Sequence, residues 1–137
     1  DEQGSFTTID LLAADLTTRE AALYKYGAAP TYIKRQGSVR RLAGNSLPVG
    51  LEETGAAPQA IRFPLEENTF LLMISDGVAD SVDDQWLQDL LAGWQGSDPN
   101  VLASLVLREA YQRRRGDDDR SALCVYLPAG KRGRREV

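Results

Sequence analysis

Two apolar segments in the second half of the chain are joined directly to acidic residues. Residues 70–75 read Phe-Leu-Leu-Met-Ile-Ser and are followed at once by Asp76, whereas residues 122–127 are preceded by the acidic run 117–119. Both apolar runs predict buried strands. A carboxylate at the end of one strand can meet a carboxylate at the start of another at one edge of a sheet. Such a pair predicts a site for a hard cation, Mg²⁺ or Mn²⁺.

The composition narrows the chemistry that the chain can perform. Its 137 residues, 42% hydrophobic and 26% charged, suit one globular domain with a substantial core. The absence of histidine excludes a Ser-His-Asp triad, a histidine base and a His-ligated zinc site. The single cysteine, Cys124, excludes an internal disulfide, and its apolar surroundings predict a buried, unreactive thiol. The groups that remain available for chemistry are carboxylates, hydroxyls, arginines and backbone amides.

The charge is unevenly distributed along the chain. A net charge of −4 argues against nonspecific nucleic-acid binding, so no nucleic-acid partner is expected. Basic residues cluster at 113–115 and 131–135. We expect residues 128–137 to form a basic, disordered tail, with a phosphate- or membrane-facing patch as the alternative. The sequence has neither a signal peptide nor an apolar run of about 18 residues.

The first residues do not resemble a natural translation start. The chain begins Asp1-Glu2, and its only methionine is Met73. We therefore expect a piece of a longer protein or a processed product. A terminal residue missing from the sequence is the alternative.

Alternating patterns and turn residues predict an α+β domain with a mostly antiparallel sheet. The expected strands span residues 6–16, 20–26, 31–35, 38–42, 59–63, 69–75 and 122–127. Apolar residues at helical spacing predict a helix around residues 86–94, with both tryptophans packed in the core. A second helix is expected from Pro99 to about Arg114, with Asp98 as its N-cap. Both helices precede the last strand.

Each acidic segment has a plainer interpretation than cation binding. Asp76 followed by Gly77 is also typical of an Asx turn, and for this pair alone the two interpretations are about even. The run 117–119, taken alone, is better explained as a solvated loop that balances the arginines at 113–115. Adjacent carboxylates repel one another, however, and a cation would relieve that repulsion. Together, the two segments therefore indicate a cation site more specifically than either segment does alone.

Small-residue loops occupy residues 27–30 and 45–50. Ordinary turns explain them best from composition alone, and close approach of a substrate is the alternative.

The order and spacing of five short motifs resemble the C-terminal half of a stage II sporulation protein E-type phosphatase domain. This group belongs to the metal-dependent Ser/Thr phosphatases of the 2C type, and the resemblance extends to about Leu127. Two of the motifs favour the sporulation branch over the stress-response phosphatases. The matching segments are Phe6–Asp10, Tyr26–Thr31, Asn45–Gly50, Ile74–Val78 and Asp118–Ser121.

The resemblance implies roles for the acidic residues. Asp76 and Asp118 would bind catalytic Mn²⁺ or Mg²⁺, two ions being held in the intact domain. Asp119 and Gly77 would support these ligands without binding the ion. Asp117 is an additional acid for which the resemblance gives no role.

The resemblance also implies that the chain is incomplete as an enzyme. The family's other metal ligands lie in a segment that precedes these motifs, so residues 1–127 would form the C-terminal portion of an α-β-β-α sandwich. The missing N-terminal half of the same domain is an expected partner, and self-association could cover the same surface. Little or no activity is expected from the chain alone.

For the intact domain, the resemblance implies hydrolysis of phosphoserine or phosphothreonine on a protein such as a phosphorylated anti-anti-sigma factor. The expected setting is the cytoplasm, on a parent protein that could carry a membrane anchor. Gly27, Ala28, Pro30 and Asn45 are candidates for substrate or switch contacts. The alternative hypothesis is a noncatalytic interaction module, in which the acidic edges are solvated loops.

Overall fold

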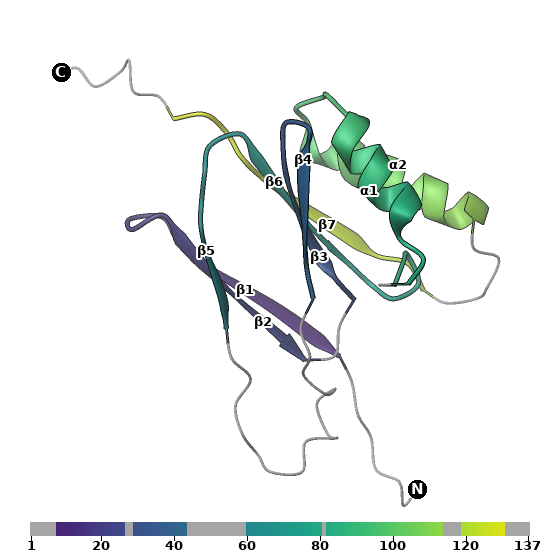
Figure 1. Ribbon diagram of the computed structural model, residues 1–137, viewed down its shortest axis with the longest axis horizontal. Helices are drawn as coiled ribbons and strands as arrows, with labels where there is room; N and C mark the ends of the chain where they lie inside the picture. Colours follow the sequence, from purple (N-terminus) through teal and green to yellow (C-terminus); the bar gives the residue numbers. More distant parts are fainter. Residues whose placement is uncertain (1–7, 27–28, 44–59, 81, 114–118, 131–137) are drawn as a thin grey trace, which may run out of the picture.

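The computed structural model describes residues 8–26, 29–43, 60–80, 82–113 and 119–130. These residues form two antiparallel sheets and two helices (Figure 1), which confirms the predicted α+β class. The elements are β1 (Ile9–Asp15), β2 (Glu20–Tyr26), β3 (Thr31–Arg35), β4 (Ser38–Leu42), β5 (Ile61–Pro64), β6 (Thr69–Ile74), α1 (Gln85–Gly93), α2 (Pro99–Arg113) and β7 (Ala122–Leu127).

The strands divide between a three-stranded sheet of order β1-β2-β5 and a four-stranded sheet of order β4-β3-β6-β7. Helices α1 and α2 lie on one face of the four-stranded sheet, and the three-stranded sheet lies on the other side (Figure 1). Short turns join the strands of hairpins β1–β2 and β3–β4. Arg19 and Gln36 have φ angles of 59° and 57° in these turns, a conformation that closes tight hairpins.

Strand β6 lies in the middle of the four-stranded sheet and contributes to two hydrophobic cores. Alternate side chains of a strand point to opposite faces. The helix-side core includes Tyr32, Phe70, Leu72, Ile74, Leu87, Leu91, Leu102 and Val106. The core between the sheets includes Ala21, Leu23, Leu42, Phe63, Leu65 and Leu71. On β7, burial raises the pKa of the Cys124 thiol to about 11, in keeping with the expected unreactive thiol.

Helix α2 begins as the sequence predicts. Pro99 is its first residue, and the Asp98 carboxylate accepts a hydrogen bond of 2.9 Å from the backbone amide of Asn100. Trp86 and Trp94 are partly buried and pack against the helix-side core, as expected. Neither helix in the described part of the chain is long and apolar enough to span a membrane.

A buried carboxylate ties α1 to the four-stranded sheet. Asp84, the residue before α1, is 4% exposed and accepts hydrogen bonds from the Tyr32 hydroxyl at 2.7 Å and from Arg41 Nη1 at 3.0 Å. Burial by itself would raise the pKa of Asp84, but hydrogen bonds from Tyr32, Arg41 and Gln88 lower it below its ordinary value. Burial and the neighbouring carboxylate raise the pKa of Tyr32, which therefore remains a protonated donor.

The Tyr32→Phe variant should be less stable than the unaltered chain by about 1–3 kcal/mol, because the buried Asp84 carboxylate loses a donor while the packing is kept. Urea unfolding measures the difference. Tyr111→Phe is the matched control, since that ring is 71% exposed, and its stability should stay within about 0.5 kcal/mol. Equal stability of the two variants would contradict the importance of this bond.

Candidate functional site

Asp76 lies two residues beyond the end of β6, at the edge of the four-stranded sheet. Its side chain is exposed, whereas the next three residues, 77–79, are buried. The amide of Val78 donates to the carbonyl of Ser75 at 3.0 Å, which turns the chain sharply at this point. The carboxylate therefore faces solvent from a segment that its buried neighbours anchor, an arrangement suited to binding a ligand with little reorganisation.

Ser75 connects this edge to the acidic segment before β7. Its backbone amide donates to the carbonyl of Ser121 at 3.0 Å, and its hydroxyl oxygen accepts from the amide of Ser121 at 2.9 Å. The same hydroxyl donates to the carbonyl of Asp119 at 3.3 Å. Because β6 and β7 are antiparallel, the end of one strand lies beside the start of the other. The backbones that carry Asp76 and Asp119 thus meet at one edge.

The chemistry of the donors at this edge fits a hard cation in part. Asp76 and Asp119 are both exposed and offer carboxylate oxygens. Within the described residues no group of three or more acidic, cysteine or histidine side chains is close enough to hold an ion. Asp117 and Asp118 lie outside the described residues. The metal-binding roles of Asp76 and Asp118, and the supporting roles of Gly77 and Asp119, therefore remain predictions.

A buried ion pair between the two sheets lies near the start of β3. Lys25 of β2 is 2% exposed, and its ammonium donates to both carboxylate oxygens of Asp10, at 2.7 and 2.8 Å. It also donates to the Ala29 carbonyl at 2.7 Å and to Thr31 Oγ1 at 3.1 Å. One ammonium thus joins β1 and β2 to the segment that enters β3.

This ion pair holds residues 29 and 30, which are the part of the predicted contact loop 27–30 that the structure describes. Pro30 is buried and lies between Ala29 and Thr31, which both accept from Lys25. Thr31 pairs with Met73 near the end of β6, so this segment approaches the edge that carries Asp76. Gly27, Ala28 and Asn45, the other predicted contact residues, lie outside the described residues.

The sequence carries a signal for this ion pair, which was not among the predicted contacts. Asp10 and Lys25 occupy directly opposed positions in the β1–β2 hairpin. On their strands they share a face with Leu12 and Leu23, which pack between the sheets. Opposite charges at opposed positions on the apolar face of a hairpin predict a buried pair.

The arrangement of sheets and helices is similar to that of solved phosphatase domains of the PP2C type, and this chain is part of such a domain. The phosphatase domain of the cell fate determinant SpoIIE from Bacillus subtilis, presoaked with Mn, matches with a TM-score of 0.73 and 26% identity. The match covers 90% of this chain and 57% of that one. A structure of the same phosphatase domain with a fragment of the regulatory domain gives a TM-score of 0.78 at 26% identity, over 88% of this chain and 38% of that one.

The family model for Stage II sporulation protein E (SpoIIE) matches residues 1–128, and the chain belongs to this family. Stage II sporulation protein E of Bacillus subtilis (strain 168) is 27% identical over 129 residues, which are 89% of this chain and 16% of that protein. The chain therefore spans about a sixth of this relative. The resemblance inferred from the five motifs is confirmed.

The Lys25→Met variant should lose about 3–5 kcal/mol of stability, because the partly buried Asp10 carboxylate would lose its cationic partner and the Ala29 carbonyl would lose its ammonium donor. Chemical denaturation measures the loss. The double variant Lys25→Met/Asp10→Leu, which removes both charges, should recover part of it. A Lys25→Met variant within about 0.5 kcal/mol of the unaltered chain would show that the ion pair contributes nothing to stability.

Proposed function

We propose that this chain supplies the C-terminal part of the active site of a metal-dependent protein serine/threonine phosphatase. In this proposal, Asp76 and Asp118 hold Mn²⁺ or Mg²⁺. The observation that carries the proposal is the set of hydrogen bonds between Ser75 and residues Asp119 and Ser121, in a chain of the SpoIIE family. Those bonds hold the two acidic strand ends at one edge.

The neighbouring residues would support the ligands in different ways. Asp119 directly follows Asp118, and its carbonyl accepts from Ser75, so it would orient the segment that carries the ligand. Gly77 has no side chain beside the Asp76 carboxylate, which leaves room for the cation and its waters. Oxygen donors of this kind match the preference of both cations.

The proposed reaction is hydrolysis of phosphoserine or phosphothreonine on a protein, with a phosphorylated anti-anti-sigma factor as the proposed substrate and the cytoplasm as the setting. When bound, the cations would supply Lewis-acid activation of water and neutralise charge on the phosphoryl group. The residues of this chain would contribute by positioning the segments that meet the substrate. Lys25 holds the carbonyl of Ala29, and thereby positions Pro30 near the edge where Gly27, Ala28 and Asn45 would meet the substrate or a switch segment.

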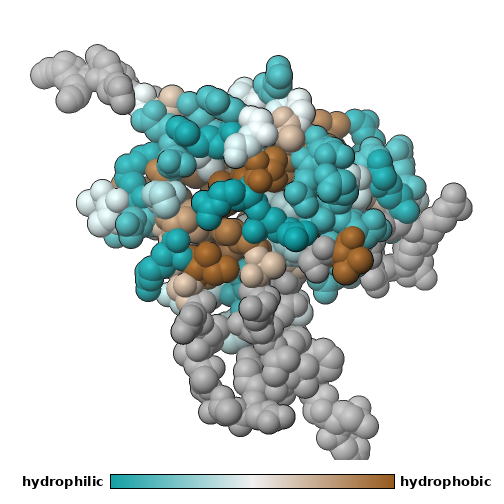
Figure 2. All heavy atoms as spheres, viewed as in Figure 1, coloured by the Kyte–Doolittle hydropathy of each residue, from teal (hydrophilic) through white to brown (hydrophobic). Residues whose placement is uncertain are grey.

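The proposal includes a partner for the three-stranded sheet. Hydrophobic side chains reach the surface over this sheet (Figure 2), and Ile9 and Leu11 of β1 are 42% and 56% exposed. Tyr26 and Tyr24 lie opposite them on β2. We propose that the N-terminal half of the same domain covers this face and supplies the remaining metal ligands, with a second copy of the chain as the alternative cover. The chain alone would then hydrolyse phosphoprotein little or not at all.

Calorimetric titration of Mn²⁺ into the chain tests the metal site. We expect weak binding that falls at least about tenfold in Asp76→Asn and in Asp118→Asn, because each substitution removes a charged ligand. Asp83→Asn is the matched control, since it removes one charge from an exposed side chain on the same connection and should leave binding unchanged. Binding that survives either ligand substitution would contradict a shared site.

If the folded chain binds no Mn²⁺, the titration is repeated after addition of the N-terminal segment of the domain. Binding that appears only then, and that both substitutions weaken, supports a site completed by the two parts. Continued absence of binding favours the noncatalytic interaction module.

A further inference from the structure

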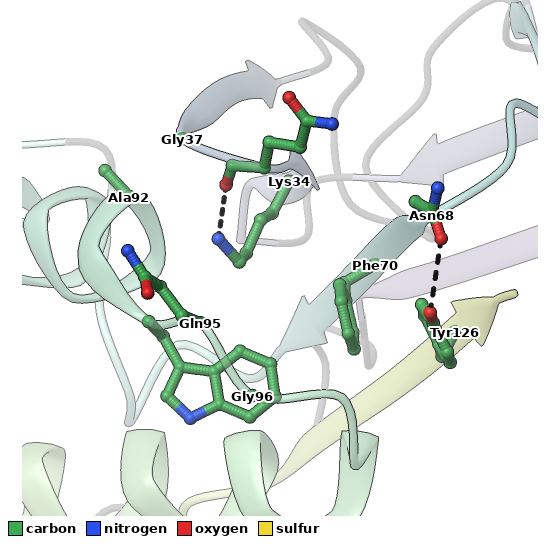
Figure 3. A pocket seen from close by; sticks show the side chains of 10 residues that line it. Lys34, Gly37, Asn68, Phe70, Ala92, Gln95, Gly96 and Tyr126 are labelled. Carbon is green, nitrogen blue, oxygen red and sulfur yellow. Dashed lines mark hydrogen bonds between the residues drawn. The ribbon is translucent and has the colours of Figure 1, made fainter. Parts of the chain in front are cut away.

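A cavity of about 360 Å³ opens at the end of the four-stranded sheet opposite to Asp76 (Figure 3). It lies between the β3–β4 turn, the start of β6, the end of β7 and the residues that follow α1. The residues that matter for its chemistry are Lys34, Phe70, Trp94, Gln95, Gly96 and Tyr126. Its volume is within the range of about 300–1,000 Å³ that is typical of small-molecule sites.

Lys34 gives this cavity a buried positive charge. The residue is 3% exposed, and its ammonium donates to the carbonyl of Gln36. Among the described residues this carbonyl is its one assigned acceptor, and no carboxylate there is within ion-pairing distance. An ammonium has three N–H donors, so donor capacity is left over. Figure 3 shows its amino end turned toward the side of the pocket where Gln95 lies.

The surroundings of Lys34 disfavour its charge. Burial lowers the pKa of the Lys34 ammonium from its ordinary value. The other buried lysine, Lys25, has the Asp10 carboxylate as its partner. An anion entering the cavity would give Lys34 the partner that it lacks in the described part of the chain.

Aromatic rings form the wall of the cavity. Phe70 meets Trp94 edge-to-face with 5.2 Å between ring centroids, and it stacks on Tyr126 with 4.2 Å between centroids. A Cβ atom at Gly96 would come within 2.5 Å of the Trp94 ring, so glycine allows the chain to pass closely over the indole. These rings offer a flat apolar surface that suits a planar ligand.

We infer that this cavity binds a small aromatic carboxylate. Its carboxylate would accept from the Lys34 ammonium and the Gln95 amide, and its ring would pack against Phe70 and Tyr126. Lys34 is the cationic residue among those that line the cavity. One ammonium balances the single charge of a carboxylate, whereas a phosphate dianion would bring a second charge with no partner. The inference is independent of the proposed phosphatase function.

Fluorescence titration with benzoate tests the inference. The chain has two tryptophans, so a Trp86→Phe background leaves Trp94 as the only indole reporter. Benzoate should change the Trp94 signal with saturation at a dissociation constant of about 1 mM or below. Benzamide, its neutral analogue of the same shape, should bind at least about tenfold more weakly. Phenyl phosphate should also bind more weakly than benzoate.

Lys34→Met keeps the length and burial of the side chain but removes its charge, and it should abolish the preference for benzoate over benzamide. Circular dichroism checks that this variant is folded. If it does not fold, the NMR signal of the Lys34 ε-methylene in the unaltered chain replaces it. That signal should move with benzoate and not with an equal concentration of sodium chloride.

Four results would overturn the inference. In the unaltered chain these are no response to benzoate, equal affinity for benzoate and benzamide, or tighter binding of phenyl phosphate than of benzoate. The fourth is a folded Lys34→Met variant that still prefers benzoate over benzamide. If Lys34 had a purely structural role, in which its ammonium only closes the β3–β4 turn, the unaltered chain would show no fluorescence response to benzoate.

Discussion

The burial of β6 is the constraint on which the rest of this structure depends. The strand lies between β3 and β7, and its side chains alternate between the helix-side core and the core between the sheets. Removing apolar surface from water is the main favourable term in folding, and a charged side chain within such a strand would cost much of that gain. The first carboxylate can therefore appear only where the strand leaves the sheet, and Asp76 occupies that position. Burial of the strand thus places the proposed ligand at the edge.

The two buried lysines show how different surroundings lead to different roles. Lys25 has a carboxylate, a carbonyl and a hydroxyl as acceptors, so its charge is balanced and its function is to hold β1, β2 and the entry to β3 together. Lys34 donates to a backbone carbonyl and lines a cavity walled by aromatic rings. A balanced buried charge stabilises one arrangement of the chain, whereas an unbalanced one favours binding of an anion. The same residue type therefore indicates a structural contact in one place and a ligand site in the other.

Local features of the sequence predicted local structure well. Strands β2, β3, β4 and β7 have the predicted bounds, because alternation and turn residues act over a few positions. Asp98 begins α2 through its own side chain. The resemblance implied two β layers, but the assignment of each strand to one of them could not be predicted, because alternation shows that a strand has a buried face and does not identify its partner. The pairings β3–β6 and β2–β5 connect strands distant in the chain. The cavity depends on the pairing of β6 with β3 and with β7, which alternation does not identify, so it could not be predicted from the sequence.

The hydrogen bonds of Ser75 bear on how the proposed metal site would work. Carboxylates brought to one edge repel each other, so an edge held together only by a cation would separate when the ion leaves. Here neutral hydrogen bonds between Ser75 and residues Asp119 and Ser121 hold the Asp119 segment beside Asp76. These bonds would reduce the ordering that a bound cation has to supply, and the cost of that ordering would otherwise lower the affinity for the cation. The affinity of the proposed site would then depend on the number of oxygen ligands, and the N-terminal part of the domain is the proposed source of the remaining ones.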